Sequence, residues 1–117
     1  MPTDSLEQLR QRLAEFAAAR DWDQFHSPKN LAMALIAEAA ELIEHFQWLT
    51  EEQSRCLSPV KQQAVSYELA DILIYLIRIA DKLNIDLITS AQIKIQLNEN
   101  RYPVERVKGD ARRANEY

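Results

Sequence analysis

The sequence predicts an all-α fold, a bundle of about four helices that assembles as a homo-oligomer. The chain of 117 residues contains one glycine and four prolines, which leaves little material for turns. The two pairs Ser27-Pro28 and Ser58-Pro59 have the form of helix starts, because Ser caps a first turn and Pro fits the first helical position. No segment shows the alternation of apolar and polar residues that is typical of a strand.

The composition limits the classes of function. The length indicates one domain, and the 47% of apolar residues suffice for a core. The net charge of -4 argues against binding to polymeric nucleic acid, which requires clustered Lys and Arg. Cys56 is the only cysteine, so we expect no internal disulfide and a cytoplasmic setting. Residues 1–12 are too polar for a secretory signal, and the most apolar run, Leu69 to Ala80, is too short for a membrane helix.

The first two helices are expected between Asp4 and Leu49. Asp4-Ser-Leu-Glu7 has the form of a capping box that opens a helix ending near Arg20. The aromatic connector DWDQFH, residues 21–26, leads to a second helix that starts at Ser27-Pro28 and ends near Leu49. We expect the polar residues 50–57 that follow to be irregular.

The third helix, from Ser58-Pro59 to about Leu83, is apolar on nearly every side between Leu69 and Ala80. A helix in a small domain cannot bury its whole circumference against two or three neighbours. We therefore interpret it as shared between the core and a subunit interface. The alternative is that it is simply the central helix.

The fourth helix is predicted to follow a left-handed residue at Asn84. Asp86 caps it, and it runs to about Arg101, where a proline two residues later stops it. We expect residues 1–103 to form the helical domain. Residues 104–117 are expected to form a C-terminal tail that is mobile or lies on a neighbouring subunit.

Two acidic pairs stand in apolar surroundings. Glu38 and Glu41 are three residues apart, as are Glu68 and Asp71, so each pair lies on one helical face. If the pairs face each other, four carboxylates surround one point. Because burying an unpaired carboxylate is costly, such groups normally bind a metal or form an ion pair. Arg78, on the face of Asp71, offers the ion-pair alternative.

The candidate ligands are all oxygen atoms, which suits Mg²⁺ or Mn²⁺. A di-iron bundle is disfavoured because it requires Glu-x-x-His on two helices, and His45 stands four residues after Glu41. Mg²⁺ usually binds through a few carboxylates together with substrate phosphates. The site therefore predicts a nucleotide or another polyphosphate as substrate.

Further side chains could hold such a substrate. On the fourth helix, Lys94, Asn98 and Arg101 share a face that would suit phosphates and a sugar, although a basic stripe is usually just solvated. The aromatic residues Trp22 and Trp48 are more often core, but Trp48 shares the face of the first acidic pair. This position would let Trp48 stack on a base.

His26 could hydrogen-bond a base or only the connector backbone. Tyr75 lies on the face of the second acidic pair and could reach the same cavity.

The motifs Glu38-x-x-Glu41 and Glu68-x-x-Asp71 resemble the signature of the all-α nucleoside triphosphate pyrophosphohydrolases, the MazG-like superfamily. Three blocks are similar to those of the dCTP pyrophosphatases, and together they cover most of Glu15 to Pro103. They are RDWDQFHSPKNLAMALIAEAAELIEHFQW, ELADILIYLIRIADKLNIDL and KIQLNENRYP.

The resemblance implies Mg²⁺-dependent hydrolysis of a deoxynucleoside triphosphate, dCTP or a modified dCTP, to the monophosphate and pyrophosphate, as house-cleaning of the nucleotide pool. It implies assembly as dimers or tetramers. The implied metal ligands are Glu38, Glu41, Glu68 and Asp71. The residues implied near the base are Trp22, His26 and Trp48, and those around the sugar and phosphates are Lys94, Asn98, Arg101 and Tyr102.

Our mechanistic hypothesis is an in-line attack of water on the α-phosphorus, with Glu38, or alternatively Glu41, orienting the water. Two other classes of function remain open. One is a non-catalytic helical interaction or regulatory module that binds a nucleotide without cleaving it. The other is a broad hydrolase for damaged or methylated nucleotides.

Overall fold

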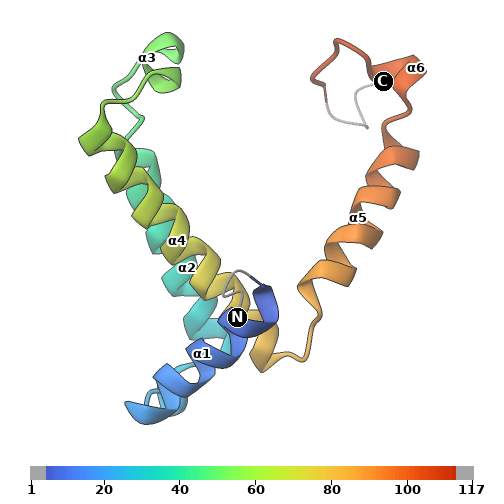
Figure 1. Ribbon diagram of the computed structural model, residues 1–117. Coiled ribbons are helices and arrows are strands. Elements are labelled where there is room, and N and C mark those ends of the chain that lie inside the picture. The colour runs from blue at the N-terminus through green and yellow to red at the C-terminus, as the bar shows by residue number, and fades with distance from the viewer. Residues whose placement is uncertain (1–4, 113–117) are drawn as a thin grey trace. The chain divides into compact units, whose positions relative to one another are not determined.

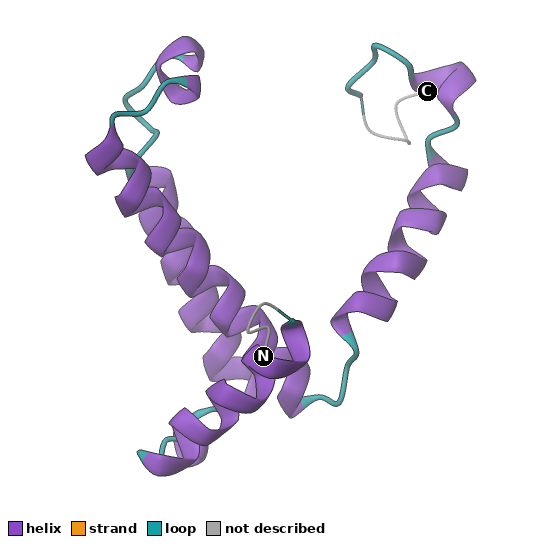
Figure 2. Cartoon of the chain, viewed as in Figure 1, coloured by secondary structure: helices purple, strands orange, loops and turns teal. Residues whose placement is uncertain are grey.

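The computed structural model describes residues 5–112, and helices make up most of this range, with no strand among the described residues (Figures 1 and 2). The all-α prediction is confirmed. The elements in chain order are α1 (Leu6–Ala19), the 3₁₀ turn η1 (Asp23–Phe25), α2 (Pro28–Glu44), α3 (Glu51–Arg55), α4 (Pro59–Lys82), α5 (Leu87–Arg101) and α6 (Val104–Val107). The four predicted helices correspond to α1, α2, α4 and α5.

The chain divides into two compact units, residues 1–84 and residues 85–117. In the first unit, α2 and α4 lie side by side and antiparallel, connected through α3, and α1 packs against α4 (Figure 1). The second unit contains α5 and α6, and residues 88–101 of α5 are exposed. None of the described helices is long and apolar enough to cross a membrane.

Most of the predicted helix starts are confirmed. The Ser27 hydroxyl accepts a hydrogen bond from the Asn30 N–H at 3.1 Å, and a proline occupies the first helical position. Ser58 caps α4 in the same way. Asn84 is left-handed, with φ 55°, and ends the α4 segment as expected. The Asp86 carboxylate then caps α5.

The start of α1 was predicted one residue too early. Ser5 is the N-cap, because its backbone is extended and its hydroxyl accepts a hydrogen bond from the Gln8 N–H at 3.1 Å. The expected cap Asp4 lies outside the described residues. Glu7 forms an ion pair with Arg10, at 2.6 Å from Oε1 to Nη2.

The end of α2 and the segment after it also differ from the prediction. The helix ends at Glu44, and short-range turns follow, such as the bond from the Phe46 N–H to the Ile43 carbonyl at 2.9 Å. Part of the segment of residues 50–57, which was expected to be irregular, forms the helix α3. The helix starts there because Thr50 and Gln53 make a capping box, in which each side chain accepts a hydrogen bond from the other residue's backbone N–H. Trp48 therefore lies beyond α2, and the helical-face argument for it was wrong.

The buried apolar core of the described chain is small. Its members are Ala17, Leu31, Val65, Ile77 and Ala80. Large apolar side chains on the outer faces of α2 and α4 remain exposed, among them Ile36 and Ile43 on α2 and Leu69 and Leu73 on α4. Apolar patches of this kind are typical of surfaces that a partner covers.

Candidate functional site

Three acidic side chains converge between α2 and α4. Glu38 and Glu41 lie one turn apart on α2, and Glu68 faces them from α4, so that one carboxylate oxygen of each lies within 4.8 Å of the others. The antiparallel packing of these two helices brings the acids together. Asp71 lies one turn after Glu68 on the same helix, and it lines a neighbouring pocket.

The charges in this acid cluster, Glu38, Glu41 and Glu68, are not compensated within the described chain. The Oε2 atoms of Glu38 and Glu68 are buried without a hydrogen-bond partner. No ion pair joins the cluster to a Lys or Arg in residues 5–112. Burial, together with the nearby carboxyl groups of Glu68 and Glu41, raises the pKa of Glu38 from 4.5 to about 7.

The donor set of the acid cluster fits a divalent cation. Ionised carboxylates only accept hydrogen bonds, so the members of the cluster cannot satisfy one another while all of them are ionised. Buried acids without a donor are destabilising unless a cation or a proton compensates them. Arg78 does not do so, because it pairs with Asp23 and Asp81. An all-oxygen site with one exposed side suits a hard divalent ion.

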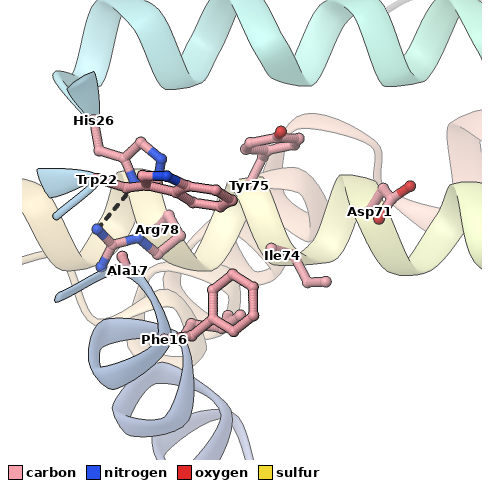
Figure 3. A pocket seen from close by; sticks show the side chains of 9 residues that line it. Phe16, Ala17, Trp22, His26, Asp71, Ile74, Tyr75 and Arg78 are labelled. Carbon is pink, nitrogen blue, oxygen red and sulfur yellow. Dashed lines mark hydrogen bonds between the residues drawn. The ribbon is translucent and has the colours of Figure 1, made fainter. Parts of the chain in front are cut away.

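A pocket of about 310 Å³ lies beside the acids, where α1, the η1 connector and α4 meet (Figure 3). Its walls are mostly apolar and aromatic, and a few polar groups reach into it, which is the usual character of a small-molecule site. The lining residues are Leu13, Phe16, Ala17, Trp22, His26, Asp71, Ile74, Tyr75 and Arg78. The edge of one ring meets the face of the other where Phe16 and Trp22 pack, with centroids 5.6 Å apart.

Tyr75 and Asp71 join the pocket to the acid cluster. They lie one turn apart on α4, and both line the pocket (Figure 3). Burial, with the negative charges of Glu38 and Asp71, raises the pKa of the Tyr75 phenol. A ligand in the pocket would therefore lie close to the carboxylates.

The remaining predicted site residues are Trp48 in the first unit and four residues of the second unit. Trp48 is 87% exposed. Lys94, Asn98 and Arg101 are exposed on α5, and Tyr102 caps the end of this helix. These last four residues belong to the second unit. Within the first unit, the structure brings together the acid cluster and, in the adjoining pocket, Trp22, His26, Asp71 and Tyr75.

The sequence pattern suggested Arg78 only as an alternative ion-pair partner of Asp71, and its pairing with Asp23 was missed. Arg78 is only 4% exposed, and its Nη2 donates to the Asp23 carboxylate at 2.9 Å. The sequence does indicate such a pairing, because Arg78 is a cation within the most apolar stretch of α4. A buried cation requires an acidic partner. Phe16 and Ile74 also line the pocket, although their sequence positions do not distinguish them from core residues.

The MazG-like family model matches residues 34–116, a range that includes both acidic pairs. The chain belongs to the MazG-like family. The resemblance carried by the acidic motifs is thereby confirmed. In this MazG-like protein, Trp22 and His26 precede the matched range.

Among curated proteins, dCTP pyrophosphatase 1 from Bos taurus is 45% identical over 109 residues, which cover 92% of this chain and 64% of the bovine protein. The human dCTP pyrophosphatase 1 is 41% identical over 117 residues, which cover 98% of this chain and 69% of the human protein. The MazG-like chain thus spans about two thirds of the length of these relatives.

Among solved structures, the MazG-like chain is similar to a pyrophosphatase from Archaeoglobus fulgidus. The TM-score is 0.80 and the sequences are 37% identical, over 84% of this chain and 92% of that chain. This likeness supports the helical architecture independently of the family model.

Proposed function

We propose that this MazG-like protein hydrolyses a deoxynucleoside triphosphate, dCTP or a modified dCTP, to the nucleoside monophosphate and pyrophosphate, with Mg²⁺ or Mn²⁺ as cofactor. The observation that carries the proposal is the pair of buried, unpartnered carboxylate oxygens on Glu38 and Glu68. The names of two relatives support the substrate class, because both mammalian proteins are called dCTP pyrophosphatase 1. The role we propose is house-cleaning of the nucleotide pool.

The proposed cation ligands are Glu38, Glu41, Glu68 and Asp71. When bound there, the cation neutralises triphosphate charge and polarises the phosphorus under attack. The carboxylates keep this face of the site negative, so that a triphosphate without a cation is repelled. Substrate and cation are therefore expected to bind together.

Glu38 is our choice for the residue that orients the attacking water, with Glu41 as the alternative. Glu38 is half-buried, and its Oε2 has no protein partner among the described residues, so it is available to accept a hydrogen bond from water. Glu41 is exposed and therefore less well shielded from bulk solvent. An acceptor that is shielded from bulk solvent orients a water molecule more strictly than a solvated acceptor does.

The aromatic pocket is the proposed base site. A cavity of about 310 Å³ is at the small end of ligand sites and suits a single-ring base better than a drug-sized molecule. We assign Trp22, His26 and Tyr75 to this site from its lining. Trp48 near the base, and Lys94, Asn98, Arg101 and Tyr102 around sugar and phosphates, remain predictions from the resemblance.

We also propose a homodimer or homotetramer, in which copies of the chain cover the exposed apolar faces of α2 and α4. The division into a domain of residues 1–103 and a tail of residues 104–117 remains a prediction. So does the cytoplasmic setting, with which the free and exposed Cys56 agrees.

Product analysis tests the proposed function. The protein is incubated with each deoxynucleoside triphosphate and Mg²⁺, and the products are separated by anion exchange. Monophosphate and pyrophosphate, formed fastest from dCTP or 5-modified dCTP and not formed with EDTA, would support the proposal. Diphosphate and phosphate would mean that another bond is cut. Binding of dCTP without any product would establish the non-catalytic module.

A further inference from the structure

Arg78 connects the aromatic connector to α4 through a defined set of contacts. Its Nη2 lies 2.9 Å from the Asp23 Oδ1. The same Nη2 lies 3.1 Å from the His26 Nδ1 (Figure 3). Its Nη1 lies 3.5 Å from the Asp81 Oδ2. With 4% of its surface exposed, the guanidinium is enclosed by these partners.

These contacts restrict the protonation of His26. A guanidinium has only donors, so the His26 nitrogen at 3.1 Å must accept and therefore carries no proton. The neutral ring then carries its proton on Nε2. Burial and the positive charge of Arg78 lower the pKa of His26, which keeps the ring neutral; Lys82 acts in the same direction and Asp23 opposes it.

We infer that Arg78 is a positioning residue that fixes His26 as the Nε2–H tautomer, so that the ring presents a hydrogen-bond donor to the pocket. His26 lines the pocket, and the ring edge away from Arg78 faces the side on which Tyr75 lies (Figure 3). The Nε of Arg78 is also buried without an acceptor in the described chain and is not open to a ligand. The donor that this corner of the pocket offers is therefore the Nε2–H of His26.

The network around Arg78 keeps its guanidinium in place. Asp23 also binds the Lys82 ammonium at 2.8 Å, and Asp81 also binds the Arg10 guanidinium at 3.1 Å. Each acid is thus shared by two cations. Both acids would keep one partner if Arg78 were replaced, so a variant without the guanidinium is expected to fold.

A fixed N–H donor selects a planar ligand with an acceptor on the edge that faces it. If the proposed function holds, the ligand edge belongs to the base. Cytosine carries an acceptor at N3 beside O2, whereas uracil and thymine carry an N–H at position 3 between their O2 and O4 acceptors, so a donor that faces position 3 favours cytosine. The fixed donor of His26 then favours cytosine, and Arg78 determines base preference without touching the reacting atoms.

The first test measures the tautomer directly and needs no substrate. The chain has two histidines, so ¹⁵N-histidine labelling and a long-range ¹H–¹⁵N spectrum resolve both rings, with His45→Gln for assignment. The expected result is an unprotonated Nδ1 and a protonated Nε2 on His26. In Arg78→Met this pattern should give way to a mixture of tautomers, whereas Lys82→Met, which removes the other cation on Asp23, should retain it.

Two results would overturn the inference. One is a proton on the His26 Nδ1 of the wild-type protein. The other is an unchanged Nε2–H tautomer in Arg78→Met. The wild-type spectrum decides the tautomer even if Arg78→Met does not fold.

The second test measures base preference. The ratio of kcat/KM for dCTP to that for dUTP should fall roughly tenfold or more in Arg78→Met and change by less than about twofold in Lys82→Met. The ratio of Kd values for dCMP and dUMP, from Trp fluorescence, gives the same comparison without turnover. In another outcome, the wild-type protein binds dCMP more tightly than dUMP and yet turns over no triphosphate. That result would overturn the proposed hydrolysis and leave this inference standing. An unchanged preference in Arg78→Met would overturn the inference.

Discussion

Glu38 on α2 and Glu68 on α4 face each other across the helix pair, and the Oε2 atom of each is buried with no hydrogen-bond partner in the described chain. A stable fold does not normally retain such an arrangement without a compensating charge. Function therefore explains the relationship between these two residues better than stability does.

Replacement of an acidic side chain by its amide should abolish turnover without unfolding the protein. We expect Glu38→Gln and Asp71→Asn to reduce the rate of pyrophosphate release by roughly 100-fold or more, because each loses a charge needed at the reacting phosphate. Glu44→Gln, at an exposed position at the end of α2, is the matched control and should stay near the wild-type rate. Near-normal activity of Glu38→Gln or Asp71→Asn would show that the assignment is wrong.

The raised pKa of Glu38 predicts how metal-free stability depends on pH. The folded protein retains the Glu38 proton up to a pH of about 7, whereas the unfolded chain releases it near 4.5. The folded state thus binds more protons in this interval, and its stability falls as pH rises. Melting temperatures in EDTA should decline across this interval more steeply for wild type than for Glu38→Gln.

The same comparison tests the repulsion among the acids. At neutral pH without metal, Glu38→Gln should be at least as stable as wild type. A large drop in its melting temperature would instead indicate that Glu38 takes part in a stabilising ion pair.

Addition of Mg²⁺ should stabilise the folded protein. A ligand at a hundredfold excess over its Kd adds about 2.7 kcal/mol to the free energy of unfolding. Differential scanning fluorimetry should therefore show a rise in melting temperature that saturates with Mg²⁺. The rise should be lost in Glu68→Gln and retained in Glu44→Gln. Equal stabilisation of all three proteins would place the ion outside the acid cluster.

The apolar face of α4 should determine the oligomeric state. Leu73 lies on this face and is exposed, so Leu73→Glu should dissociate the assembly without disturbing the buried core. Val60→Glu is the matched control, because it introduces the same charge on the same helix at a position that is 82% exposed. It should leave the mass of the assembly unchanged. Light scattering coupled to size exclusion measures the mass. A wild-type mass for Leu73→Glu would exclude this face as the interface.

Features set by neighbouring residues could be predicted from the sequence. Ser27-Pro28 and Asp86 start helices because their side chains bond to the backbone three residues later. Asn84 was identified because Asn tolerates a left-handed backbone. The Thr50–Gln53 capping box was equally local and could have been read in the same way.

Features that depend on tertiary contacts were predicted only in part. The convergence of Glu38 and Glu68 followed from the cost of burying acids, which restricts where they can point. The pairing of Arg78 with Asp23 joins residues 55 positions apart, and no spacing rule relates them. The alternative pairing of Arg78 with Asp71 is not found, because Asp23 of the connector and Asp81 on α4 bind the guanidinium instead. Trp48 was misplaced because turns at residues 45–48 replace the last predicted helical turn.

The small buried core has a consequence for how the protein responds to dilution. Five buried apolar side chains, two of them alanines, leave most of the apolar surface of α2 and α4 without cover in a single described chain. If a second copy provides this cover, unfolding and dissociation become one equilibrium, and mass action governs both. Dilution then acts as a denaturant, and the melting temperature rises with total protein concentration.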